Sequence, residues 1–160
     1  MSSPILIGFD GSELSRRAIQ TAGALLGTRD AIVLHVYEPV GVPVLPTPAG
    51  VAMVADTAAF VPDHAELDEI ARRQALDVAN LGVGEAHAAG LRPTCETAVA
   101  QGTSGVATAI VETAARRGAT MIVVGSHGRS AIGAALLGSV STAVLHRSTV
   151  PVLVVPARPG

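Results

Sequence analysis

The segment 125–139 places glycines and serines where they could bind phosphate. It reads GSHGRSAIGAALLGS, follows an apolar run and leads into a predicted helix. Gly125 and Gly128 can adopt positive φ angles and leave room for phosphate oxygens near the backbone, and successive N–H groups in such a loop form a nest for anions. Gly138 and Ser139 stand at the start of the helix, where free N–H groups and the helix dipole favour phosphate. The pattern therefore predicts an anion site made largely of backbone donors.

Polar side chains in the same segment strengthen this interpretation. Ser130 and Ser139 offer hydroxyl groups, and Arg129 offers a guanidinium that can bind phosphate strongly. All eleven cationic side chains are arginine, which excludes a Walker A lysine and a Schiff-base lysine. The alternative is a glycine-rich turn before an ordinary capped helix. His127 is expected to be solvated rather than catalytic, and the other histidines lack metal-ligand spacing.

Composition limits the classes of protein that this chain can belong to. Its 160 residues are 49% hydrophobic and 15% charged, which predicts one folded domain over residues 1–160. A net charge of −2 and an aromatic content of 2% argue against a nucleic-acid partner. No apolar run is long enough to span a membrane, and no signal peptide is recognisable, so we expect a cytoplasmic protein. Cys95 is expected to pack as a small apolar residue.

Apolar runs alternate with helical segments along the chain. Nearly continuous apolar runs are typical of parallel strands buried on both faces, and the more polar run 92–99 is typical of an edge strand. The alternation predicts an α/β fold, an open parallel five-stranded sheet in the order 3-2-1-4-5 with helices on both faces. The expected strands are 4–9, 31–37, 92–99, 121–124 and 150–155, and the expected helices are 14–27, 63–89, 103–117 and 139–147.

The predicted sheet order indicates where a ligand would bind. In such a sheet ligands lie beyond the carboxyl ends of the strands, where the strand order reverses. That point falls between residues 10–12 and the segment that starts at Gly125. In the helix 63–89 an apolar stripe is expected to face the sheet, and Gly82 and Gly84 are expected to weaken its second half. The stripe consists of Leu67, Ile70, Ala71, Leu76, Val78 and Leu81.

Two further segments predict contacts beyond the core. The proline-rich stretch 38–62 is expected to form a long loop, either a flexible insertion or a lid or partner-binding segment. The last strand, 150–155, is apolar and uncharged. As a sheet edge it is expected to pair antiparallel with a second copy and form a homodimer. The alternative is a monomer in which the tail or the 38–62 loop covers this edge.

Three stretches of the sequence resemble one known family. The pattern Gly125-x2-Gly128-x9-Gly138-Ser139 is similar to the motif G-x2-G-x9-G-[S/T] of ATP-binding universal stress proteins. The opening 7–12 and the tail 140–155 also resemble this family, so the similarity covers nearly the whole chain outside 38–62. The resemblance implies a Rossmann-like fold of the adenine nucleotide alpha-hydrolase type. It also implies an adenine nucleotide as the ligand, ATP with or without Mg²⁺.

The resemblance also implies roles for individual residues. Asp10 would contact the nucleoside through a ribose hydroxyl, Gly8 would lie beside the adenine, and Val36 would pack on it. From the residues alone, Asp10 before a helix also fits a turn or cap. The chain departs from the family at 133–135, Gly-Ala-Ala, where a basic residue is frequent, so weaker phosphate binding is expected. The residues implied around the phosphates and their approach are Val124, Gly125, Gly128, Arg129, Ser130, Gly138, Ser139 and Val140.

Three functions follow from these patterns. The first is a small regulatory protein of the stress response that binds ATP and acts on a protein partner that the sequence does not identify. The second is a slow ATPase or nucleotidyl-transfer enzyme on the same fold, disfavoured because no general base or phosphate-clamping lysine is recognisable. The third is a nucleotide-independent interaction module, which the retained glycine motif argues against.

Overall fold

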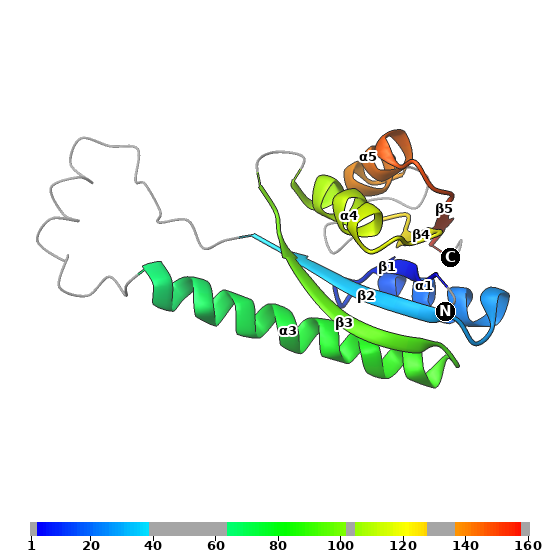
Figure 1. The fold of residues 1–160 in the computed structure, drawn as a ribbon, viewed down its shortest axis with the longest axis horizontal. Coiled ribbons are helices and arrows are strands. Elements are labelled where there is room, and N and C mark those ends of the chain that lie inside the picture. The colour runs from blue at the N-terminus through cyan, green and yellow to red at the C-terminus, as the bar shows by residue number, and fades with distance from the viewer. Residues whose placement is uncertain (1–2, 39–63, 102–104, 128–136, 158–160) are drawn as a thin grey trace, which may run out of the picture.

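Residues 3–38, 64–101, 105–127 and 137–157 are described by a computed structural model of the chain (Figure 1). Strands and helices alternate, and each expected element is present to within a few residues. The strands are β1 (Ile5–Gly8), β2 (Asp30–Tyr37), β3 (Arg92–Val99), β4 (Ile122–Gly125) and β5 (Val152–Val155). The helices are α1 (Glu13–Leu26), α3 (His64–Ala88), α4 (Gly105–Arg116) and α5 (Ser139–Arg147). The predicted 38–62 loop lies, from residue 39 on, outside the described residues.

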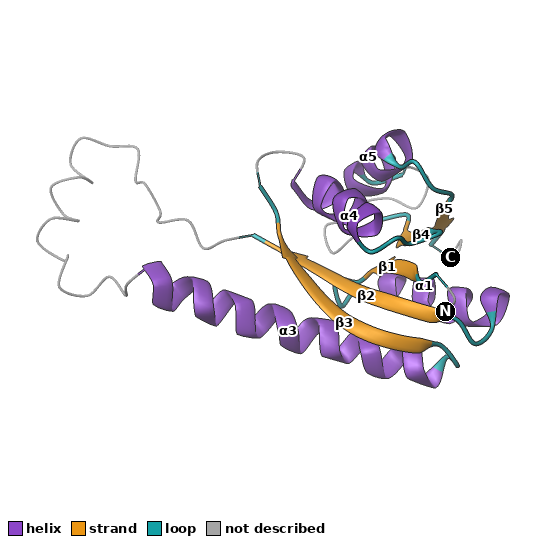
Figure 2. Cartoon of the chain, in the orientation of Figure 1, coloured by secondary structure: helices purple, strands orange, loops and turns teal. Residues whose placement is uncertain are grey.

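The five strands form one parallel sheet in the order β3-β2-β1-β4-β5, which confirms the predicted topology (Figure 2). Alternate side chains of the central strands enter two apolar clusters. Ile5, Ile7 and Val33 pack against α1 and α3 on one face. Leu6, Ile32 and Ile122 pack against α4 and α5 on the other. The carboxyl ends of β1 and β4 lie side by side at the predicted position, and the chain leaves β1 towards α1 on one face and β4 towards α5 on the other.

The side of α3 that packs on the sheet consists of small residues, so the predicted stripe is wrong in part. Leu81 is 61% exposed and Ile70 is 46% exposed. At Gly82 an added Cβ would lie 2.7 Å from Phe9 Cδ1 and from Val33 Cγ1, so glycine lets the helix approach the sheet closely. The helix is continuous through both of its central glycines. Its buried residues are Ala71, Ala75, Ala79, Gly82 and Ala86.

The two edges of the sheet differ in chemistry. On β3 the predicted burial of Cys95 is wrong, because the thiol is free and exposed on the outermost strand. Glu96 of the same strand binds Arg116 at 2.8 Å and Arg117 at 3.2 Å. By contrast, Val152–Val155 carries no charge, and its first three residues are half-buried. An edge strand with charged groups resists pairing with another chain, whereas an apolar edge favours it.

Candidate functional site

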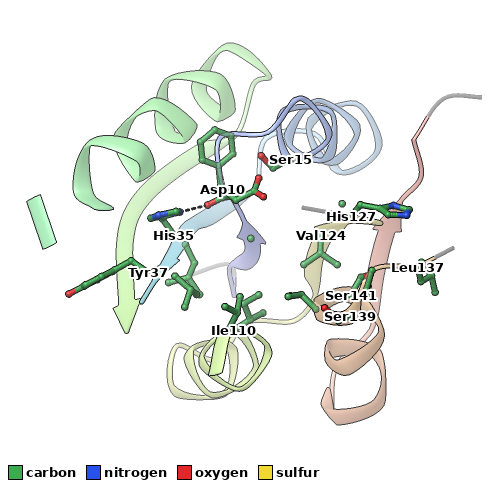
Figure 3. A pocket seen from close by; sticks show the side chains of 18 of the residues that line it. Asp10, Ser15, His35, Tyr37, Ile110, Val124, His127, Leu137, Ser139 and Ser141 are labelled. Carbon is green, nitrogen blue, oxygen red and sulfur yellow. Dashed lines mark hydrogen bonds between the residues drawn. The ribbon is translucent and has the colours of Figure 1, made fainter. Parts of the chain in front are cut away.

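A cavity of about 860 Å³ lies at the carboxyl end of the sheet, beside the ends of β1, β2 and β4 (Figure 3). It gathers predicted site residues from both ends of the chain into one place. Those that line it are Gly8, Asp10, Val36, Val124, Gly125, Gly138, Ser139 and Val140. Three further predicted residues, Gly128, Arg129 and Ser130, lie outside the described residues.

The cavity also has lining residues that the sequence reasoning did not assign to it. Most belong to the end of β2, the first half of α4 and the segments that flank the glycine loop. The end of β2 could have been anticipated, because parallel strands end at the same edge of a sheet. The contribution of α4 comes from packing across the sheet and has no sequence signal. These residues are Phe9, Ser15, Leu34, His35, Tyr37, Glu38, Val106, Ile110, His127, Leu137 and Ser141.

The turn between β1 and α1 brings a carboxylate to the cavity. Gly11 has a φ of +80°, a conformation that glycine adopts at little cost. The Ser12 N–H donates to Asp10 Oδ1 at 3.0 Å. The Ser12 hydroxyl in turn caps α1 by accepting from the Ser15 N–H at 3.2 Å. Asp10 therefore shapes the turn and also lines the cavity, so the two alternatives for this residue are compatible.

Backbone polar groups of β2 also reach the cavity. The β1–β2 ladder ends at the Gly8–Leu34 pair, where the Phe9 N–H donates to the Leu34 carbonyl at 2.9 Å. Because peptide groups alternate in direction along a strand, the N–H and C=O of Val36 also face the β1 side. Neither forms a hydrogen bond with another described residue. Val36 thus offers one donor and one acceptor to a ligand.

The N-terminus of α5 supplies further backbone donors. Gly138 is the N-cap residue of α5 and, as a glycine, makes no capping hydrogen bond through a side chain. Its N–H donates to the Ser126 carbonyl at 2.7 Å, and the Ser141 hydroxyl donates to the same carbonyl at 2.8 Å. These bonds tie the first turn of α5 to the end of β4. The N–H groups of Ser139, Val140 and Ser141 have no acceptor among the described residues, as is usual in the first turn of a helix.

Positive φ angles are not the reason for glycine at the two described positions of the loop. Gly125 does not have a positive φ, and Gly138 has a φ of −67°. Instead, a Cβ on Gly125 would lie 2.9 Å from Leu14 Cγ, and one on Gly138 would lie 3.1 Å from the Ser126 carbonyl oxygen. Close packing of the backbone therefore selects glycine at both positions. Gly128 lies outside the described residues.

The charges around the cavity are unevenly arranged. Among the described lining residues, the carboxylates are Asp10 and Glu38, and no arginine is present. The positive potential at the opposite end comes from the first turn of α5. His127 lines the cavity, and its Nδ1 lies 2.9 Å from the Ser126 hydroxyl. Within the described residues, no group of three or more His, Cys, Asp or Glu side chains could hold a metal ion.

Comparison with known proteins identifies the family. The sequence profile described as the universal stress protein family matches residues 1–156. The chain belongs to the universal stress protein family. This membership confirms the family that the sequence resembles. Among the described residues of this universal stress protein, no helix is long and apolar enough to cross a membrane.

Two curated relatives differ in the share of their own length that this chain matches. A universal stress protein of Mycolicibacterium smegmatis is 36% identical over 153 residues, which are 94% of this chain and 47% of the relative. The universal stress protein YxiE of Bacillus subtilis is 32% identical over 160 residues, 97% of this chain and 99% of the relative. The chain thus spans about half the length of the first and nearly all of the second.

Solved structures share the fold over almost their entire length. The hypothetical protein MJ0577 is 25% identical, with a TM-score of 0.73 over 100% of this chain and 99% of that one. A universal stress protein in complex with cAMP is 26% identical, with a TM-score of 0.60 and 97% coverage of both chains. The universal stress protein of Archaeoglobus fulgidus in complex with dAMP is 21% identical, with a TM-score of 0.60 over 94% and 95% of the two chains.

Proposed function

We propose that this universal stress protein binds an adenine nucleotide, foremost ATP, in the cavity at the carboxyl end of its sheet. The observation that carries the proposal is the arrangement of three kinds of polar group around one cavity. Val36 offers a backbone donor and acceptor, Asp10 a carboxylate, and α5 the N–H groups of its first turn. The cavity volume, about 860 Å³, is within the roughly 300–1,000 Å³ of small-molecule sites.

The base fits the end of the cavity formed by β2. Apolar side chains of Leu34, Val36 and Ile110 line this part and can cover the faces of a purine ring. Adenine carries an amino donor next to ring-nitrogen acceptors, and the N–H and C=O of Val36 match such an edge. The complexes of related proteins with cAMP and dAMP support an adenine base.

The ribose and phosphates fit the remaining two groups. A carboxylate accepts hydrogen bonds from hydroxyl groups, so Asp10 is suited to the ribose. The first turn of α5 carries three N–H donors at the positive end of the helix dipole, which is suited to phosphate. Gly8 and Gly125, which have no side chains, line the cavity between its base end and its phosphate end. Gly128, Arg129 and Ser130 are proposed to complete the phosphate site, and Mg²⁺ would be held largely by phosphate oxygens.

The proposed role is regulatory binding rather than rapid turnover. A hydrolytic enzyme needs a positioned general base that activates the attacking water. In the described residues at the α5 end of the cavity, His127 is the one titratable side chain, and its Nδ1 already contacts the Ser126 hydroxyl. We therefore propose slow hydrolysis at most, with nucleotide occupancy altering contacts to a protein partner in the cytoplasm.

A direct test is the nucleotide that accompanies the protein on purification. The protein is purified without added nucleotide and denatured, and the supernatant is separated by ion-exchange chromatography. We expect an adenine nucleotide in a ratio approaching one per chain, and its phosphate content identifies ATP, AMP or cAMP. A protein that yields none and does not bind added ATP in calorimetry would contradict the proposal and favour a nucleotide-independent interaction module.

We also propose a homodimer formed by β5 of two copies. This strand is an uncharged apolar edge, whereas the opposite edge, β3, carries Glu96 with its two arginine partners. An antiparallel pair about a two-fold axis would cover both copies of the apolar edge. Light scattering at micromolar concentration tests this proposal. A mass near twice that of one 16.1 kDa chain is expected, and a mass near that of one chain would refute it.

A further inference from the structure

We propose that His35 is a positioning residue that keeps the Val36 N–H available to the base of a bound nucleotide. The side chain of His35 is 9% exposed and lies at the wall of the cavity. Its Nδ1 lies 2.8 Å from the Phe9 carbonyl oxygen, a contact drawn as a dashed line in Figure 3. The proposal rests on the proposed nucleotide site and assigns a task there to a residue that the sequence patterns left unused.

The hydrogen bond fixes which nitrogen of the imidazole carries a proton. A carbonyl oxygen can only accept, so the Nδ1 of His35 must be the donor. Both the neutral Nδ1–H tautomer and the charged ring meet this requirement. The bond joins the carbonyl at the end of β1 to a side chain of β2.

The Phe9 carbonyl is the acceptor that the next rung of the sheet would use. In a parallel ladder, a residue that donates to one neighbour accepts from the residue two positions further along that neighbour. Phe9 donates to Leu34 at 2.9 Å, so its carbonyl would accept from the N–H of Val36. The ladder stops at the Gly8–Leu34 pair instead, and the imidazole occupies this carbonyl.

The imidazole therefore acts as a stop, because it prevents the β1–β2 ladder from extending by one more hydrogen bond. Without it, a buried carbonyl would lack its partner, and backbone acceptors strongly tend to be satisfied. The Val36 N–H is the donor that the ladder pattern places opposite this carbonyl, and a bond between them would extend the ladder by one rung. That rung would remove the Val36 donor from the cavity and draw the two strands together where the base is proposed to bind. The sheet thus lacks one hydrogen bond, and the Val36 N–H stays available to a ligand.

Amide hydrogen exchange measured by NMR on the nucleotide-free full chain tests the stop directly. Leu34 lies within the ladder and Val36 lies just beyond it, so we expect the Val36 amide to exchange at least about tenfold faster, as for a bond with about 1.4 kcal/mol less protection. In His35→Leu the extra rung should slow exchange at Val36 and leave Leu34 unchanged. Equal protection of Val36 and Leu34 in the wild-type chain would overturn the proposal, even if the variant failed to fold.

Binding of ATP measured by calorimetry tests the consequence for the site. His35→Leu should weaken binding about tenfold, the factor that corresponds to about 1.4 kcal/mol. His35→Asn places an amide nitrogen where the ring carries Nδ1, so it should restore the bond to Phe9 and recover most of the loss. His35→Gln reaches the position of Nε2 instead and should not restore binding. The exposed His87 of α3 provides the matched control, and His87→Leu should bind ATP normally.

The outcomes separate this proposal from the proposed function. If wild-type protein does not bind ATP, the nucleotide site is refuted, while the exchange rates of Val36 and Leu34 still decide whether His35 stops the ladder. If wild-type protein binds ATP but His35→Leu binds it equally well, the positioning role alone is refuted. Rescue by glutamine and not by asparagine would also overturn it, because the imidazole would then contact the ligand through Nε2.

Discussion

Replacing Asp10 separates its role in the turn from its proposed role in nucleotide binding. One carboxylate oxygen, Oδ1, accepts from the Ser12 N–H at 3.0 Å. Asparagine can keep its carbonyl oxygen at that position and so preserve the turn. It then presents an NH₂ group in place of the second oxygen, and an NH₂ group cannot accept from a ribose hydroxyl. Alanine removes both interactions.

The expected magnitudes follow from these bonds. Loss of the hydrogen bond to the Ser12 N–H should lower the free energy of unfolding of Asp10→Ala by about 0.5–1.5 kcal/mol. Loss of the bond from a ribose hydroxyl to a charged carboxylate should weaken nucleotide binding by about 1–3 kcal/mol, or about five- to 150-fold in Kd. Asp10→Asn should lose a similar share of affinity while it keeps more of the wild-type stability than Asp10→Ala does.

Two assays on the same samples decide whether Asp10 contributes to ATP binding as well as to the turn. Urea unfolding followed by circular dichroism gives the free energy of unfolding, and calorimetry with ATP gives Kd. The expected combination is an Asp10→Asn variant that is more stable than Asp10→Ala but binds ATP about as weakly. If this variant binds ATP with the wild-type Kd, Asp10 only shapes its turn, and the assignment to the ribose is refuted.

Three further predictions test the phosphate end, the packing of α3 and the proposed dimer interface, and a fourth concerns acid stability. Gly138→Val places a side chain within 3.1 Å of a backbone carbonyl oxygen at the start of α5. The affinity for ATP measured by calorimetry should fall at least about tenfold, while the circular dichroism spectrum stays unchanged, and an unchanged affinity would remove α5 from the site. Gly82→Ala should lower the free energy of unfolding in urea by about 1–3 kcal/mol through overpacking, whereas Gly84→Ala, with nothing within 4 Å of its added Cβ, should not; equal effects would contradict the close approach of α3. Val154→Lys should shift the mass in light scattering towards one chain, because a charge would be buried where two copies of β5 meet; a dimer that persists would place the interface elsewhere. Hydrogen bonds from Arg72 and Arg73 hold the pKa of Glu69 at about 2, below its ordinary 4.5, so the stability that Glu69 contributes is present above about pH 4.5 and is lost as the pH falls to about 2. In thermal unfolding, Glu69→Gln should therefore lose less stability over this pH interval than the wild type, and equal losses would refute the prediction.

The sheet order and the place of the cavity could be predicted because they depend on alternation and chain direction. Four apolar runs and one polar run, 92–99, leave few arrangements of a parallel sheet, and the polar run belongs at an edge. The carboxyl ends of the first and fourth strands then meet at one point. This reasoning leads to residues 10–12 and to the segment that starts at Gly125, and Asp10 and Gly125 both line the cavity.

Several details could not be predicted because they depend on packing between elements distant in the sequence. Glycine spacing indicates that a side chain is not tolerated, but the cause at Gly125 is contact with Leu14 of another element. Periodicity in α3 favoured large aliphatic residues such as Leu81, yet the close approach to Phe9 selects small ones. The task proposed for His35 depends on where the β1–β2 ladder ends, which no local pattern reveals.

The central claim is that an adenine nucleotide lies between the end of β2 and the start of α5. It is tested most directly by titrating ATP into the isotopically labelled full chain and following the backbone amide signals by NMR. Saturable shifts are expected at Gly8, Val36 and the first turn of α5, from Ser139 to Ser141, with little change along the edge strand β3. Absence of saturable shifts, or shifts confined to residues outside the cavity, would contradict it.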